Sequence, residues 1–407
     1  MLRGLRMGST LLALAFAAVC FLAGGYYEST YSLLAAAVWL GIALAGSLGR
    51  LRAPSAAFWA LAALAAWTAA SASWGPAEPA LRIAPLAALY AGVLLAAEQV
   101  DTQALLRFTW AVVVGVSALA LLFYRGGRLD WPVTYANGLG LVAGLGLLLS
   151  LGRRSRLGSA ICLLALVLTF SRSAILATAV GAVVLLAVEG RIPRRVAIAG
   201  GAILAVVAIL VAQPLAARFA GPAPDERDAR RLLDVSGHGR TDLWRSAWEQ
   251  GLDRPIAGGG AGTWAEGYRQ GADRLTAPAN AHSLPLETFA ELGLVGVALL
   301  AAFVLLVARG ARRDAAAAAV VTAWLVQASA DWVWQLPAAT LPMLFAAAAL
   351  APRRAECSER QGLSMAVAAL AIGAACALQG VQAAMREADR SPGGGMAASA
   401  MPATLEP

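Results

Sequence analysis

The 407-residue sequence contains no lysine, so all 32 of its basic residues are arginine. Charged residues of both signs make up only 14% of the chain, whereas soluble globular proteins average roughly 25%. The lack of lysine excludes a P-loop nucleotide site, which needs a lysine after its glycines. The scarcity of charge excludes an ordinary soluble domain of this length.

Histidine and cysteine are also scarce, with two and four residues. Two histidines without a nearby cysteine cluster give poor ligand spacing for zinc, so we predict no metal site and no cofactor. The polar interval of residues 213–283 contains both histidines, and it contains none of the cysteines, Cys20, Cys162, Cys357 and Cys376. No disulfide framework is therefore expected to stabilise that interval.

Hydrophobic residues, in contrast, make up 59% of the chain, and the mean hydropathy is +0.68. Apolar runs close to the ~20 residues that cross a bilayer alternate with short breaks that carry Arg, Gly or Pro. The pattern predicts an all-α integral membrane protein with about 12–13 transmembrane helices. We place these helices near residues 9–25, 31–48, 55–72, 81–97, 104–123, 135–151, 157–170, 172–188, 196–212, 284–308, 314–330, 334–350 and 364–384.

This assignment divides the chain into four parts. We expect N-terminal transmembrane helices over 1–212 and a large extracytoplasmic loop with short helices over 213–283. C-terminal transmembrane helices follow over 284–384, and a Gly-, Ala- and Pro-rich tail over 385–407 is predicted to be disordered. The short runs at 157–170 and 172–188 could also form one broken helix.

The distribution of charge sets the orientation, because arginine collects in cytoplasmic loops. The loops assigned to that side carry 17 arginines and six acids, a net charge of +11. Residues 213–283 carry nine of each, and the remaining external segments sum to −3. The net charge of +8 and the pI near 9.9 therefore reflect membrane topology, and nucleic acid is not an expected partner.

Two polar positions stand out within the N-terminal helices. Arg172, in Thr169–Ser173, is expected at the external membrane boundary, where the dipole of the following helix opposes a cation. It either clamps a phosphate together with the helix amides or extends toward lipid phosphate. Asn137 lies near a helix start and either caps that helix or faces a cavity, while Gly140 and Gly144 indicate close helix packing.

The polar loop contains an amphipathic segment and a glycine-rich segment. Residues 242–251 place Leu243, Trp244, Ala247 and Trp248 at helical spacing, with packing or the membrane interface as alternative roles for the tryptophans. Arg240 precedes this segment and either binds a phosphate or caps the start of the helix in contact with solvent. The glycines of 258–262 predict a tight turn or a close backbone approach to a glycan or lipid.

His282 immediately precedes a helix expected to begin at Ser283, with Pro285 in its first turn. The positive end of that helix favours a neutral imidazole, as a general base or hydrogen-bond acceptor requires. A lone histidine is more often structural. Its position between a glycine-rich loop and two acids of an apolar helix, Glu287 and Glu291, favours a functional role.

Several of these segments occur together in the order and spacing of one family. They are TFSRSA at 169–174, GRTDLWRSAW at 239–248, PIAGGGAGT at 255–263, AHS at 281–283 and ETFAELGLVG at 287–296. Together they resemble the O-antigen ligase/polymerase family of polytopic membrane glycosyltransferases, over roughly residues 135–350. Many members carry Asn after the histidine, where this chain has Ser283.

The resemblance implies transfer of a glycan from an undecaprenyl-diphosphate carrier to an acceptor hydroxyl without a metal. The protein would lie in the cytoplasmic (inner) membrane, with its active site on the extracytoplasmic side. It implies that Arg172 and Arg240 hold the diphosphate and that His282 activates or orients the acceptor. We also predict substrate-binding roles for Asn137, Gly260, Gly262 and Glu287. The acceptor is a glycan or glycolipid, or a protein in an O-oligosaccharyltransferase of the same family; a transporter or flippase of lipid-linked glycans is the alternative class.

Overall fold

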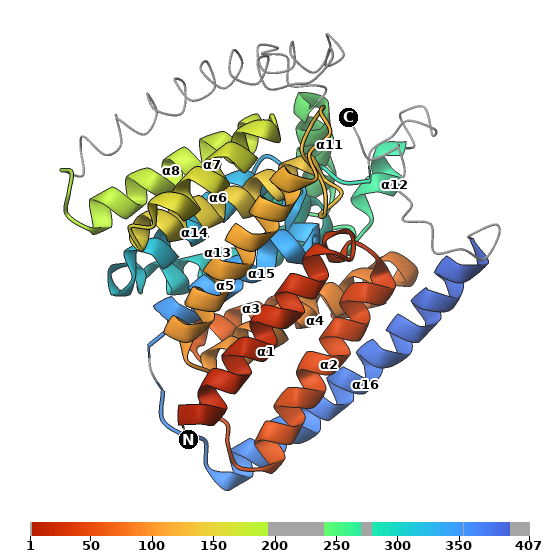
Figure 1. Ribbon diagram of the computed structural model, residues 1–407. Helices are drawn as coiled ribbons and strands as arrows, with labels where there is room; N and C mark the ends of the chain where they lie inside the picture. Colours follow the sequence, from red (N-terminus) through yellow and green to blue (C-terminus); the bar gives the residue numbers. More distant parts are fainter. Residues whose placement is uncertain (1, 194–239, 270–278, 353, 391–407) are drawn as a thin grey trace. The chain divides into compact units, whose positions relative to one another are not determined.

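The computed structural model describes residues 2–193, 240–269, 279–352 and 354–390 (Figure 1). Within these ranges the regular secondary structure is helical, and the one pairing of extended backbone is an isolated bridge between Arg52 and Glu356. The long apolar runs form helices because a helix satisfies every backbone polar group within one segment. The predicted all-α integral membrane fold is confirmed.

Each expected span within the described residues coincides with a helix. Six helices of the described chain are long and apolar enough to cross a membrane: α2 (Glu28–Ser47), α3 with its extension η2 (Ala56–Ala70 and Ser71–Ser73), α4 (Ala77–Glu98), α5 (Thr102–Leu122), α13 (Leu284–Ala308) and α16 (Glu359–Asp389). Shorter apolar helices are the Met7–Cys20 part of α1 (Leu2–Cys20), α6 (Ala136–Gly152), α7 (Arg156–Leu168), α8 (Arg172–Val188), α14 (Ala315–Ala328) and α15 (Pro337–Leu350). The expected span 196–212 lies outside the described residues.

The structure decides between the alternatives for residues 157–188 and moves the expected end of the last helix. The runs at 157–170 and 172–188 form two helices, α7 and α8, because Phe170 between them has a left-handed φ of 51°. Helix α16 begins at a capping box of Ser358 and Gln361 and continues to Asp389. Residues 385–389, expected to begin the tail, are therefore helical; residues 391–407 lie outside the described chain.

The chain forms two compact units, and the first comprises Met1–Gly24, Asp101–Gly239 and Ala308–Leu350. Helix α6 is its centre and packs against α5, α7, α8, α14 and α15. A Cβ on Gly140 would lie 2.8 Å from Thr169 Oγ1, and one on Gly144 would overlap Thr178 Oγ1. The expected close helix packing at these two glycines is thus confirmed, and α8 is the partner helix.

The second unit comprises Gly25–Val100, Arg240–Val307 and Ala351–Pro407. Helices α2 and α16 lie along one another, and α4 packs against α2 and α3. The polar loop contributes two helices to this unit, α11 (Arg240–Asp253) and α12 (Trp264–Arg269). Residues 213–239 and 270–278 of the predicted loop lie outside the described chain.

Candidate functional site

The residues predicted to act on substrate are distributed over both units. Asn137 and Arg172 belong to the first unit, and Arg240, Gly260, Gly262, His282 and Glu287 belong to the second. Each group is described within its own unit, beginning with the turn that carries Arg172.

Arg172 is the first residue of α8 and is partly exposed. The N-cap Ser171 accepts a hydrogen bond from Ala174 N at 3.3 Å, and Thr169 Oγ1 accepts one from Ser171 N at 3.3 Å. These two side-chain bonds stabilise the short turn in which Phe170 adopts its left-handed conformation. The local sequence thus helps to hold Arg172 at the positive end of α8.

Asn137 does not cap α6, because its side chain bonds elsewhere. Its Nδ2 donates to Asp331 Oδ2 at 2.7 Å and to the Tyr135 hydroxyl at 3.0 Å, and its Oδ1 accepts from Arg128 Nη2 at 2.7 Å. Tyr135 also donates to Asp331 Oδ1 at 2.7 Å. Asn137 is thus the middle of a buried polar network, which is a third possibility beside the cap and the cavity considered from sequence.

Helix α13 of the second unit is interrupted at Gly293, whose φ of 63° and ψ of −163° are not helical. In a regular helix the amides of Leu294 and Val295 would bond the carbonyls four residues earlier. Here they donate instead to Pro255 O at 2.8 Å and Ile256 O at 3.2 Å. The chain before the glycine-rich segment therefore supplies the acceptors that the broken helix lacks.

The glycine-rich segment supplies donors for the carbonyl oxygens that the same interruption leaves without helical partners. Gly259 N donates to Ala290 O at 2.9 Å, and Gly260 N donates to Glu291 O at 2.8 Å. Unpaired backbone groups inside a bilayer cost several kcal/mol each, so an interrupted membrane helix needs such substitutes. The backbone that this segment approaches closely in the structure is that of α13, whereas the sequence alone suggested a glycan or lipid as the partner of such an approach.

Gly260 and Gly262 lie at the start of the turn that leads into α12. The next amide, of Ala261, donates to Ser71 Oγ at 2.9 Å, and a Cβ on Gly262 would lie 2.8 Å from Pro79 Cβ. These contacts attach the glycine-rich segment to η2 and α4 as well as to α13. Among the described residues, Gly260 and Gly262 are thus in contact with the backbone and side chains of neighbouring segments of the protein.

Two buried carboxylates on one face of α13 hold the polar loop. Glu287 Oε2 accepts a hydrogen bond from Ala281 N at 2.7 Å. Glu291 Oε1 accepts from Trp264 N at 3.2 Å, and the Gly262 amide also bonds the Glu291 carboxylate. Spacing of four residues places both acids on the same helix face. Glu291 satisfies the first amide of α12 and the amide of Gly262 before it, and Glu287 fixes the backbone immediately before His282.

His282 is buried beside the N-terminus of α13 and has a left-handed φ of 53°. Its Nδ1 lies 3.3 Å from the backbone oxygen of Asn280. Because a carbonyl oxygen only accepts, this contact favours hydrogen on Nδ1 and makes Nε2 the basic nitrogen of the neutral ring. Helix α13 begins at Leu284, so the expected helix start is correct within one residue.

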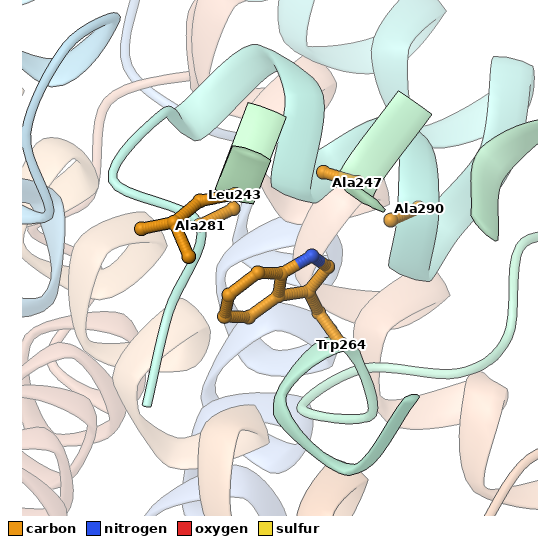
Figure 2. Close-up of a cluster of buried hydrophobic side chains, with 5 residues drawn as sticks. All are labelled: Leu243, Ala247, Trp264, Ala281 and Ala290. Atoms are coloured by element: carbon orange, nitrogen blue, oxygen red, sulfur yellow. The ribbon is translucent and has the colours of Figure 1, made fainter. Parts of the chain in front are cut away.

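A hydrophobic cluster joins α11, α12, the loop before α13 and α13 itself within the second unit (Figure 2). Trp264 is fully buried against Leu243 and Ala247 of α11, Ala281 of the loop and Ala290 of α13. The cluster packs α11, at whose first residue Arg240 lies, against the segment that carries His282.

Packing accounts for the expected amphipathic pattern of α11 only in part. Leu243 and Ala247 are buried, whereas Trp244 is half-buried and Trp248 is 52% exposed. The Trp248 ring nevertheless lies 5.2 Å from the ring of Phe289, centroid to centroid. The buried face of α11 is therefore made by its smaller residues, and its tryptophans lie at the edge of that face.

Sequence reasoning did not single out Arg128, Asp331 or Trp264. Asp331 is fully buried between two apolar helices, and an acid in such a position is a signal of function or structure that was available from sequence. Arg128 gave no such signal, because it lies in a short polar break with other charges. Among the residues that the structure describes, no group of three His, Cys, Asp or Glu side chains could hold a metal ion.

The fold and these buried polar groups define a multi-pass, all-α membrane protein with a polar segment folded onto an interrupted helix. Residues 157–301 match the family model described as O-antigen ligase. This match confirms the predicted resemblance and supports, in general terms, an enzyme of glycan transfer at a membrane. No curated protein matches the chain.

Proposed function

We propose that this protein transfers a glycan from an undecaprenyl-diphosphate carrier to an acceptor hydroxyl on the outer face of the cytoplasmic membrane. The observation that carries the proposal is the extent of the family match, which contains Arg172, Arg240 and His282. All three have the chemistry that the reaction needs. The acceptor is a glycan or glycolipid, with protein as the alternative acceptor.

In the proposed reaction, the acceptor oxygen forms a bond to the anomeric carbon while the bond from that carbon to the phosphate oxygen breaks. Negative charge develops on the departing diphosphate, and preorganised cations lower the barrier by stabilising it. Arg172 and Arg240 supply guanidinium groups, which bind phosphate oxygens in bidentate fashion. Arg172 lies at the positive end of α8, so the helix dipole adds to its attraction for phosphate.

His282 is proposed to accept the proton of the attacking hydroxyl. The Asn280 carbonyl holds hydrogen on Nδ1, and Nε2 then takes the proton as the oxygen attacks. The left-handed backbone of His282 and the hydrogen bond from Ala281 N to Glu287 hold the backbone from which the imidazole ring extends. Preorganisation of this kind reduces the reorganisation required during the reaction.

For the other predicted substrate-binding residues, the contacts favour a supporting role. Asn137 and the Gly260 amide bond to other protein groups, and Glu287 bonds the segment that carries His282. Gly262 packs close to Pro79. We propose that each of these four residues supports the catalytic residues of its own unit.

The transporter alternative has one structural feature in its favour, the interruption of α13 at Gly293, because discontinuous helices commonly form transport sites. The two functions are separated with purified protein in detergent, given lipid-linked glycan, candidate acceptors and EDTA. Product formation supports transfer. Failure with every acceptor, together with vesicle uptake by the His282→Asn variant at the wild-type rate, would support transport.

Arg172→Ala and Arg240→Ala should each reduce turnover by about 10²–10³-fold, the usual loss when one stabilising group of a transition state is removed. Expression should stay near normal, because both side chains are partly exposed. Initial rates with the lipid-linked donor provide the measurement. The control is Arg125→Ala, since Arg125 is exposed and lies outside the proposed site; an Arg240→Ala rate equal to that of this control would remove Arg240 from the mechanism.

A further inference from the structure

Arg128 connects two elements of the first unit through its guanidinium group. Its Nε donates to the carbonyl oxygen of Thr169 at 3.1 Å, and its Nη2 donates to Asn137 Oδ1 at 2.7 Å. Thr169 is the C-cap of α7, and Asn137 lies in the first turn of α6. One side chain thus ties the end of one helix to the beginning of another.

The contact with Thr169 bears directly on the position of Arg172. The last carbonyls of a helix lack intrahelical partners, and a cation is favoured at that end by the helix dipole. Arg128 takes the Thr169 carbonyl, and the adjacent Leu129 N donates to Leu168 O at 2.9 Å. Only Phe170 and Ser171 separate this attached carbonyl from Arg172, so the two bonds fix the turn from its N-terminal side.

The contact with Asn137 anchors Arg128 to the interior. Asn137 is held by Asp331 and by Tyr135, and its own backbone oxygen accepts from Gln327 Nε2 at 2.9 Å. Asp331 has an exposed fraction of 0% and also accepts from Trp332 N at 2.7 Å. Moving any member of this buried network breaks bonds made by the others, so the network holds Asn137 in place.

We propose that Arg128 is a positioning residue for the phosphate-binding turn at Thr169–Arg172, with Asn137 and Asp331 as its anchor. This inference rests on the proposed function, because it assigns the turn to the anionic diphosphate of the donor. Arg128 acts by holding the backbone from which Arg172 extends. The network therefore governs binding of the donor and leaves binding of the acceptor unaffected.

A double-mutant cycle of Arg128→Ala and Arg172→Ala tests the inference, with initial rates measured over a range of donor and acceptor concentrations. Displacing a binding group by about 1 Å costs roughly 100-fold, so Arg128→Ala should lower kcat/KM for the donor by about that factor. KM for the acceptor should stay within about 2-fold of wild type. In the Arg172→Ala background, Arg128→Ala should change the rate by less than about 3-fold, because the residue it positions is already absent.

Two further variants keep the test decisive if Arg128→Ala fails to fold. Arg128→Lys keeps the positive charge and a long aliphatic side chain, but it lacks the planar guanidinium group that bonds Thr169 O and Asn137 Oδ1 together. It should therefore show the same selective loss of kcat/KM for the donor. Arg125→Ala, in the same loop and exposed, should behave as wild type. Thermal melting in detergent establishes that each variant is folded.

The outcomes separate this inference from the function on which it rests. Losses that multiply in the double variant, or a folded Arg128→Lys with wild-type kinetics, would overturn the positioning role while the transferase proposal stands. Full activity of Arg172→Ala itself would overturn the assignment of the turn to the diphosphate, and with it both proposals about this turn.

Discussion

His282→Asn is expected to lower the rate of glycan transfer by about 10²–10⁴-fold, the range that a positioned general base contributes. Asparagine is chosen because it tolerates the left-handed backbone that His282 adopts, with its φ of 53°, whereas alanine would strain it. The substitution therefore removes the basic nitrogen and leaves the local fold. Initial rates at saturating donor and acceptor provide the measurement.

The thermal midpoint of His282→Asn should lie close to that of wild type, which separates loss of chemistry from loss of structure. KM for the donor should also change little, since the proposal assigns the diphosphate to the two arginines. A folded His282→Asn variant with a rate within about 3-fold of wild type would show that this histidine is structural.

The second large effect is expected for folding. Gly258→Ala should destabilise the protein by about 3 kcal/mol or more, because two costs combine at this position. Gly258 has a left-handed φ of 72°, and a Cβ there would overlap the backbone carbon and oxygen of Glu291. The glycine-rich segment could then no longer approach α13 closely enough to replace the helix bonds lost at Gly293.

Gly49→Ala is the matched control for that substitution. Gly49 also has a left-handed φ, of 64°, but no atom lies within 4 Å of the position its Cβ would take. Gly49→Ala should therefore lower the stability of the protein by only roughly 1–2 kcal/mol, the cost of backbone strain alone. Thermal melting and size-exclusion profiles in detergent compare the two, and equal destabilisation would contradict the proposed role of close backbone approach.

The helices could be predicted from sequence because hydropathy alone determines where a chain can cross a bilayer. Each expected span in the described ranges is a helix, and the turn at Thr169–Ser171 was marked in advance by its polar residues. The interruption of α13 was not predictable in the same way. Apart from Glu287 and Glu291, residues 284–308 form a mostly apolar run, and a glycine such as Gly293 is common in membrane helices.

The partners of the polar residues also required the tertiary structure. Asn137 was marked by its place at a helix start, but its partner Asp331 lies 194 residues further along the chain, and Arg128, nine residues before it, lies in a polar break that gave no sign of the contact. Likewise, the glycines of 258–262 predicted a tight turn or a close approach to a glycan or lipid, and only the fold shows that they approach the backbone of α13. Sequence thus identified Asn137 and the glycine-rich segment, and the structure identified their neighbours.

The most direct test of the account is to measure both products of one reaction. Purified protein in detergent, with EDTA present, is given a glycan on undecaprenyl diphosphate and a hydroxyl acceptor, and mass spectrometry follows glycosylated acceptor and free undecaprenyl diphosphate together. The account predicts that the two products appear in equal amounts and that both are lost in His282→Asn. Donor that stays intact with every acceptor, while vesicles of the same protein carry it across the bilayer, would contradict it.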